Sequence, residues 1–264
     1  MTLLHSLCSH RHLIGQLTKR DVFGRYRGSL LGLAWTFLNP IFLVIVYTFV
    51  FSFVFKARWG SGDDSKTQFA LVLFAGITVY NIVAEVVNAA PALLRNNVNY
   101  VKKTIFPLEI LPCVSLAAAM FHAAGSLVIL LLVQLVLGYS IPSTAVLLPL
   151  VLLPLVLMTL GVAWLLAALG VFLRDIDEVT RMLMSVLLFM SAVFFPITAL
   201  PERYQVLLQL NPLAFMIEAS RMVLFFGTVP NLTLWGGMLV GGVVTAWGGF
   251  ACFQKMRKAF SDVL

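Results

Sequence analysis

Residues 20–40 read RDVFGRYRGSLLGLAWTFLNP, a basic, glycine-containing stretch that continues directly into an apolar one. Three arginines lie near its start, and beyond Ser29 no charged residue follows until Lys56. A helix needs roughly 20 apolar residues to cross a hydrocarbon core. Basic residues beside such a run are typical of the cytoplasmic end of a span. This stretch therefore predicts a helix that enters a membrane from its cytoplasmic side.

The composition of the whole chain agrees with a membrane protein. Of its 264 residues 61% are hydrophobic and 11% charged, and the mean hydropathy is +0.98. All three values lie far from those of soluble domains. The net charge of +7 arises from short basic clusters between apolar segments. That pattern indicates membrane topology and lipid contact rather than a nucleic-acid partner.

Six apolar segments are predicted to span the membrane, which gives an all-α polytopic fold in one membrane domain, residues 1–264. With both termini in the cytoplasm, the cytoplasmic segments hold 13 of the 18 Lys and Arg residues. The predicted spans are residues 30–55, 69–90, 110–137, 144–173, 182–200 and 232–253.

A seventh apolar segment, residues 213–226, is short and contains Glu218 and Arg221. We interpret it as a re-entrant or interfacial helix on the outer side, since a seventh crossing would place the basic C-terminus outside. Asn211 is suited to be its N-cap and Pro212 its first residue. Glu218 and Arg221 lie one turn apart and are expected to form an ion pair.

Two cytoplasmic segments are predicted to have functions. Residues 1–29 combine an apolar face with several basic residues, which is typical of a helix lying in the membrane interface. The loop 91–109, PALLRNNVNYVKKTIFPLE, is expected to form a short interfacial helix suited to bind a partner protein; a plain loop with positive-inside lysines is the alternative. In the next loop, RDIDEVTR (174–181), an aspartate version of the capping box is predicted from Asp175 and Glu178.

Catalytic and metal-binding patterns are not found in the sequence. The chain has no GxxxxGK[ST] motif and no spacing that suggests a Ser, His and acid triad or a convergent metal-ligand set. Its three cysteines are far apart, and His122 is expected to be alone in an apolar helix. An enzyme acting alone is therefore not predicted, and no catalytic residue, metal site or cofactor is assigned to this chain.

Aromatic side chains recur along the first and fifth predicted spans. They pack against lipid or neighbouring helices, or they line a path along which sugar rings stack; Tyr47 is the best candidate for the latter because its hydroxyl adds a polar group to an apolar wall. The candidate channel residues are Tyr47, Phe51 and Phe55 in the first span and Phe189, Phe194 and Phe195 in the fifth, while Phe42, Phe49 and Phe53 form a second stripe.

Four stretches, taken together and in this order, resemble the membrane permease of type-2 ABC exporters, which move O-antigen, capsular polysaccharide or teichoic-acid-like polymers. They are RYRGSLLGLAWTFLNPIF (25–42), KKTIFPLEILP (102–112), FLRDI (172–176) and FFPITALPERYQVLLQLNPLAFMIEASRMVLF (194–225). The resemblance covers nearly the whole chain.

The resemblance implies a homodimer in the bacterial inner membrane, with two separate ATPase subunits that carry ATP and Mg²⁺, and an undecaprenyl-pyrophosphate-linked polysaccharide as substrate. It also implies residue roles. Coupling to the ATPase maps to Arg95, Tyr100, Lys102 and Lys103; the outer gate maps to residues 201–230 with Pro196, Asn211, Pro212, Glu218 and Arg221; contact with the lipid pyrophosphate or membrane surface maps to Arg20, Arg25 and Arg27.

Alternatives remain open at this point. A type-2 ABC exporter of small drugs or lipids would share the same spans and loop. A secondary transporter would carry ionisable residues at mid-membrane and an internal repeat, whereas Glu85 lies near the inner end of its span and no repeat is seen. A membrane scaffold without transport activity is the third alternative.

Overall fold

The computed structural model describes residues 9–26, 28–50, 66–102, 106–197 and 210–263, with Pro201, Arg203, Gln205 and Leu208. Every regular element within these ranges is helical, as the sequence predicts. Four predicted site residues, Arg27, Phe51, Phe55 and Lys103, lie outside the described residues.

Five described segments are long and apolar enough to cross a membrane. They coincide with the first, second, third, fourth and sixth predicted spans. Their helices are α3 (Trp35–Tyr47), α4 (Lys66–Ala89), α6 (Ile110–Val136), α7 (Leu148–Phe172) and α11 (Leu232–Met256).

The fifth predicted span, residues 182–200, is placed differently. Helix α8 (Ile176–Met190) begins earlier than predicted and ends at Met190. It is followed by a turn in which Ala192 has a left-handed φ of 52°, a conformation that an α-helix cannot continue through. Asp175 is the N-cap residue, but its side chain makes no capping bond, so the predicted capping box does not form. Glu178 instead lies 3.6 Å from Arg181.

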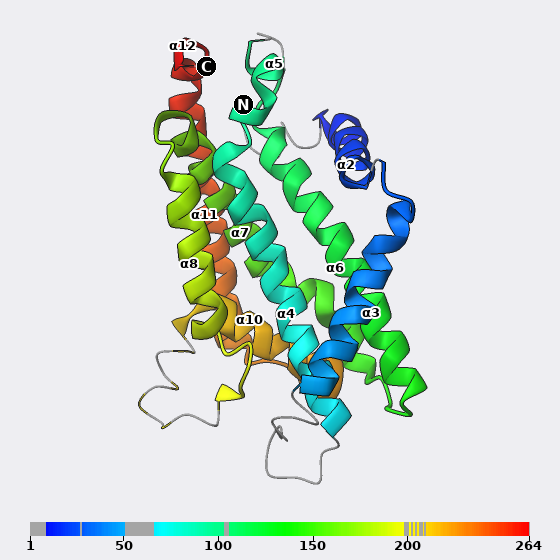
Figure 1. The fold of residues 1–264 in the computed structure, drawn as a ribbon. Coiled ribbons are helices and arrows are strands. Elements are labelled where there is room, and N and C mark those ends of the chain that lie inside the picture. The colour runs from blue at the N-terminus through cyan, green and yellow to red at the C-terminus, as the bar shows by residue number, and fades with distance from the viewer. Residues whose placement is uncertain are drawn as a thin grey trace.

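Helix α4 is the central helix of the bundle (Figure 1). It contacts α3 and α6 on one side and α8 on the other, and α7 and α10 also pack against it. In its span 83% of the residues are buried, against 17% in the span that contains α3. Most side chains of α4 therefore pack against other helices of the chain.

Helices α7 and α11 pack with their backbones in contact. A Cβ added at Gly249 would lie 2.0 Å from the carbonyl oxygen of Gly161, and one added at Gly161 would lie 2.3 Å from that of Thr245. Small residues at such crossings allow the close van der Waals packing that holds membrane helices together. This pair forms a rigid wall behind α4.

The shorter elements gather at the two ends of the bundle (Figure 1). Helices α2 (Arg11–Arg25), α5 (Val98–Val101) and α12 (Phe260–Val263) lie at one end, and α10 (Pro212–Arg221) lies at the other. The connecting turns are η1 (Gly32–Ala34), η3 (Ala90–Ala92), η4 (Arg95–Asn97), η5 (Ser143–Leu147), η8 (Arg257–Ala259) and the π-helical η7 (Met222–Phe226).

Helix α2 lies across the end of α6, as expected for an interface helix. Leu17 is buried against Ile110 and Val114, and Ile14 packs against the same cluster. The basic residues Lys19 and Arg20 on α2 are exposed. The described part of the predicted N-terminal segment thus has the expected apolar and basic faces.

Candidate functional site

A stripe of polar residues runs along one face of α4. Thr78, Asn81, Glu85 and Asn88 recur at spacings of three and four residues, which places them on the same side of a helix. Although α4 is the most buried span, Asn81 and Asn88 are exposed. The stripe therefore faces an open space within the bundle.

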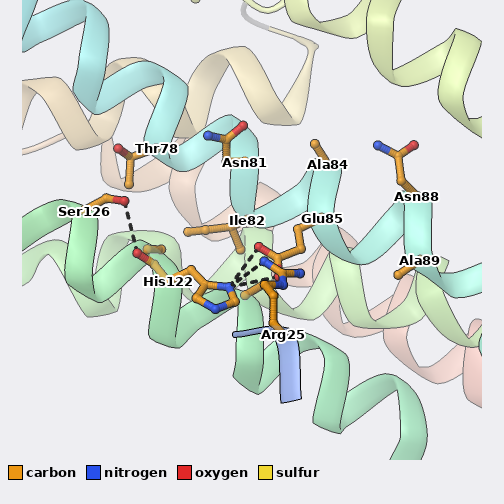
Figure 2. Close-up of a pocket in the computed structure, with 12 residues that line it drawn as sticks. Arg25, Thr78, Asn81, Ile82, Ala84, Glu85, Asn88, Ala89, His122 and Ser126 are labelled. Atoms are coloured by element: carbon orange, nitrogen blue, oxygen red, sulfur yellow. Dashed lines mark hydrogen bonds and ion pairs between the residues drawn. The ribbon is translucent and has the colours of Figure 1, made fainter. Parts of the chain in front are cut away.

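An ion pair and a histidine lie at the middle of this stripe (Figure 2). Arg25, at the end of α2, donates from Nη2 to Oε1 of Glu85 over 2.7 Å. The Nδ1 atom of His122, on α6, lies 3.0 Å from the same carboxylate oxygen and 3.2 Å from Nη1 of Arg25. His122 is the one charged or imidazole side chain of α6, as the sequence indicates, but it meets polar partners from α4 and α2 that the sequence did not suggest. Its Nε2 atom is buried and has no hydrogen-bond partner among the described residues.

These residues line a cavity of about 500 Å³, which together with its polar lining we name the α4 polar cleft. Figure 2 shows Asn81, Glu85 and Asn88 from α4 on one side and His122 and Ser126 from α6 on the other, with Arg25 reaching in between them. The volume is within the range of roughly 300–1,000 Å³ found for small-molecule sites. The residues that define the cleft are Arg25, Thr78, Asn81, Glu85, Asn88, His122 and Ser126.

Two further cavities adjoin this cleft and share Arg25 with it. One, of about 440 Å³, extends toward the α2 end of the bundle and is also lined by Arg20 and Asp21. The other, of about 160 Å³, extends toward α3 and is lined by Tyr26, Trp35 and Asn39. The three cavities form a polar region bounded by α2, α3, α4 and α6.

Arg221 on α10 occupies the opposite end of the bundle and is fully buried. Its guanidinium lies 3.4 Å from Glu218, which confirms the predicted ion pair. It also donates to three main-chain carbonyls, those of Val72 at 3.1 Å, Ala192 at 2.9 Å and Val193 at 2.7 Å. We name this group the Arg221 lock; it ties α10 to α4 and to the turn after α8.

Asn211 begins α10 as predicted. Its Oδ1 accepts from the backbone N–H of Leu213 at 3.0 Å, and Pro212 is the first helical residue. Its Nδ2 also donates to the carbonyl of Met190 and to Oγ of Ser191, which the sequence did not suggest. Asn211 therefore joins the start of α10 to the end of α8.

The loop 91–109 is attached to four other parts of the chain, α2, α7, α8 and the segment after α11. Arg20 of α2 donates to the hydroxyl of Tyr100 at 2.5 Å, and the Tyr100 ring stacks on Phe106. Arg95 forms an ion pair with Asp177 of α8. Arg257, after α11, lies 2.8 Å from the carboxylate of Glu109, and the buried Trp164 donates to the Glu109 carbonyl. Lys102 is exposed.

Of the predicted channel aromatics that the structure describes, Tyr47 lies on α3, and Phe189, Phe194 and Phe195 lie on α8 and in the turn that follows it. Tyr47 is partly buried and packs against the core from α3. Phe189 is 65% exposed on α8, and its ring centroid lies 5.4 Å from that of Phe194; Phe195 is partly buried, as is Pro196. Because α3 and α8 pack on different sides of α4, a path between these residues requires a second copy of the chain.

The sequence analysis missed the α4 polar cleft, although part of its signal was present. The spacing of Thr78, Asn81, Glu85 and Asn88 is visible in the sequence as one helical face. Arg25 was instead expected to lie at the membrane surface and His122 to be alone. Both residues contact Glu85, which lies 60 residues from Arg25 and 37 residues from His122 in the sequence. No local sequence pattern could therefore connect the three.

Comparison with known proteins identifies similar chains. The family model described as ABC-2 type transporter matches residues 12–225. An O-antigen export system permease protein RfbA of Myxococcus xanthus is 24% identical over 262 residues, which cover 98% of each chain. A protein of the same name from Klebsiella pneumoniae is 23% identical over 96% of this chain and 95% of its own. The polysialic acid transport protein KpsM of Escherichia coli is 21% identical over 91% of this chain and 90% of its own.

Proposed function

We propose, since the chain belongs to the ABC-2 type transporter family, that it is the membrane permease of an ATP-driven exporter of polysaccharide. One observation carries this proposal: the sequence is similar, over more than 90% of this chain, to permeases named for O-antigen export and to a protein named for polysialic acid transport. The chain is a multi-pass membrane subunit of a transporter, and its ATPase is a separate subunit. Family membership contradicts the alternative of a secondary transporter.

The proposal also covers the oligomeric state, the orientation in the membrane and the substrate. Two copies of the chain would enclose the path, with both termini on the cytoplasmic side of the inner membrane, and a lipid-linked glycan would be the substrate. The position of α2, α5 and α12 at one end of the bundle supports this orientation, because basic residues lie on α2 and in the segments next to α5 and α12. They are Arg11, Lys19, Arg20 and Arg25 on α2, Arg95 and Lys102 beside α5, and Lys255, Arg257 and Lys258 before α12. Residues 201–230 remain the predicted outer gate.

The loop 91–109 is the proposed docking site of the ATPase. Its attachments to α2, α8 and the segment after α11 support this role, since a displacement of the loop would reach several helices at once. Lys102 and Asn99 are exposed on its surface and free to meet a partner. The proposed coupling residues are Arg95, Tyr100, Lys102 and Lys103.

Aromatic residues of α3 and α8 are the proposed walls of the path. Sliding of a polymer requires many weak, similar contacts, whereas a tight polar site would retain the chain. Arg20, Arg25 and Arg27 are the proposed contacts of the lipid pyrophosphate; for Arg25 this role requires that its bond to Glu85 be broken.

The first test is purification of the tagged permease from native membranes in mild detergent, with the stoichiometry of bound proteins measured. We expect one nucleotide-binding ATPase per permease. In cells that lack the permease, polymer should accumulate in the cytoplasm. Recovery of the chain without an ATPase, or normal surface polymer in its absence, would contradict the proposal.

The second test concerns the path. Tyr47→Ala combined with Phe189→Ala should slow polymer export at normal protein abundance, while Phe42→Ala, in the second aromatic stripe of α3, should not. Equal export by both variants would show that Tyr47 and Phe189 face lipid or packing partners. Export of a small amphiphile with no polymer phenotype would instead identify the small-molecule exporter.

A further inference from the structure

The α4 polar cleft and its two adjoining cavities have balanced charge. Their lining contains two arginines, Arg20 and Arg25, and two acids, Asp21 and Glu85, and His122 lies 3.0 Å from the Glu85 carboxylate. Arg25 is already bonded to Glu85 at 2.7 Å. A site for a phosphate or pyrophosphate would need an excess of positive charge or of free N–H donors directed at the anion. With Arg25 paired to Glu85, the cleft therefore favours a neutral polar occupant, whereas the pyrophosphate contact proposed for Arg25 belongs to the state in which that pair is broken.

The hydrogen-bonding groups of the cleft suit a ligand with many hydroxyls. The side-chain amides of Asn81 and Asn88 form no hydrogen bond within the described part of the chain, and each offers two donors and an acceptor. Ser126 and Thr78 donate to carbonyls of their own helices and keep their oxygens as acceptors. A hydroxyl that both donates and accepts can bind to such a set from several directions.

Aromatic side chains bound the cleft on the side of α3. Trp35 and Tyr26 line the cavity of about 160 Å³ together with Asn39 and Asn81. Trp35 is 38% exposed, and its indole N–H donates to Oγ of Ser29 at 2.9 Å, so its polar group already has a partner. The rest of the ring presents apolar surface next to polar groups, which is the combination that the two faces and the hydroxyls of a sugar ring require.

From these observations we infer that the α4 polar cleft binds a sugar unit of the glycan, separately from the aromatic path between α3 and α8. The amides of Asn81 and Asn88 bind its hydroxyls, and Trp35 packs against its apolar face. This inference rests on the proposed function, because it takes the exported polymer as the source of the sugar. According to this inference, the cleft of a single chain distinguishes one glycan from another, whereas the proposed aromatic path is formed by two chains.

The test uses the full permease with its ATPase in lipid nanodiscs and a neutral oligosaccharide prepared from the host's own polymer by mild acid hydrolysis, which removes the lipid and phosphate. Binding is measured by saturation-transfer difference NMR with a concentration series. We expect saturable binding to the wild type and a dissociation constant at least tenfold higher for the variant with Asn81→Ala and Asn88→Ala. Gln16→Ala, which removes an exposed amide on α2 outside the three cavities, is the matched control and should bind as the wild type does.

Two further measurements make the outcome decisive. Inorganic pyrophosphate should not displace the oligosaccharide; displacement would show that the occupant is an anion and overturn the inference. Absence of saturable binding to the wild type, or equal binding by the cleft variant, would overturn it as well. If the double variant is recovered poorly, Asn81→Ser provides the same comparison with a side chain that stays polar.

The failure of this inference can be separated from failure of the proposed function. Polymer export is measured in the same strains. Normal export by the wild type together with unchanged oligosaccharide binding in the cleft variant would remove the cleft site and leave the exporter intact. Export that continues without the permease would remove the proposed function itself.

Discussion

Two arginines lie within the bundle in opposite situations, Arg221 at the α10 end and Arg25 at the α2 end. The Arg221 side chain is fully buried and bonded to Glu218 and three main-chain carbonyls. The Arg25 side chain is 50% exposed and bonded to Glu85 beside a cavity of about 500 Å³. A buried and saturated arginine holds elements together, whereas a paired arginine beside open space can exchange partners.

The difference follows from what surrounds each group. Around Arg221 the main chain supplies the acceptors, because the turn after α8 leaves the carbonyls of Ala192 and Val193 without helical partners. Around Arg25 the hydrogen-bonding partners are side chains of α4 and α6. The neighbouring amides of Asn81 and Asn88 form no hydrogen bond within the described part of the chain. We therefore expect substitutions at the Arg221 lock to reduce stability and those at the α4 polar cleft to affect ligands first.

The largest expected effect is that of Arg221→Leu. It would leave two buried carbonyls, at Ala192 and Val193, without a donor, and each such group costs about 1–3 kcal/mol. We expect a loss of about 3–5 kcal/mol in the free energy of unfolding, as for removal of one partner from a buried ion pair. Equilibrium unfolding in mixed micelles, followed by tryptophan fluorescence, measures it.

Arg181→Leu is the matched control for that variant. Arg181 and Glu178 have the same spacing as Arg221 and Glu218, but their side chains are 62% and 81% exposed. An exposed pair contributes about 0–1 kcal/mol. Similar losses in the two variants would contradict the distinction between a buried lock and a surface pair.

A smaller loss is expected when the lock is disturbed from α4. A Cβ added at Gly76 would lie 2.4 Å from Nη2 of Arg221 and 3.2 Å from Ile217. The guanidinium cannot retreat without breaking its bonds to the carbonyls, so Gly76→Ala should cost about 1–3 kcal/mol. Gly236→Ala on α11, where no atom lies within 4 Å, is the control and should be neutral or stabilising in the same unfolding experiment. An unchanged Gly76→Ala protein would show that the lock has room to adjust.

The sequence predicted the parts of this comparison that depend on local pattern. Five spans, the cap at Asn211 and the pair of Glu218 with Arg221 follow from apolar length, capping chemistry and helical spacing, and the structure confirms them. These features need only residues that are neighbours along one helix. The carbonyl partners of Arg221 could not be predicted, because a main-chain acceptor leaves no mark in the sequence.

The α4 polar cleft could not be predicted for a related reason. The polar stripe on α4 is periodic, but its meaning depends on Arg25 and His122, which reach it from other helices. The early end of α8 was missed as well, since residues 192–195 remain apolar and the break comes from the backbone at Ala192. Packing between distant segments decides both features.

Asn211→Ala tests the connection between α8 and α10 with a smaller expected loss. The substitution removes a helix cap and two donor contacts, to Met190 and Ser191, so about 1–2 kcal/mol should be lost. Asn231→Ala is the matched control, because Asn231 caps α11 by accepting from Thr233 and Leu234. It should cost about 0.5–1 kcal/mol. Equal losses in thermal unfolding would mean that the contacts of Asn211 to the end of α8 add nothing.

Glu85→Gln should have the smallest effect on stability, although it removes a charge from the inner end of a span. Arg25 keeps access to the cavity, and a glutamine still accepts a hydrogen bond at the same place, so the loss should be below about 1 kcal/mol. Because the pair is half exposed, the difference from the wild type should shrink further as salt is raised. Mixed-micelle unfolding at low and high salt measures both quantities. A loss near that of Arg221→Leu, unaffected by salt, would make Arg25 a second structural lock, and the contrast between the two ends of the bundle would then fail.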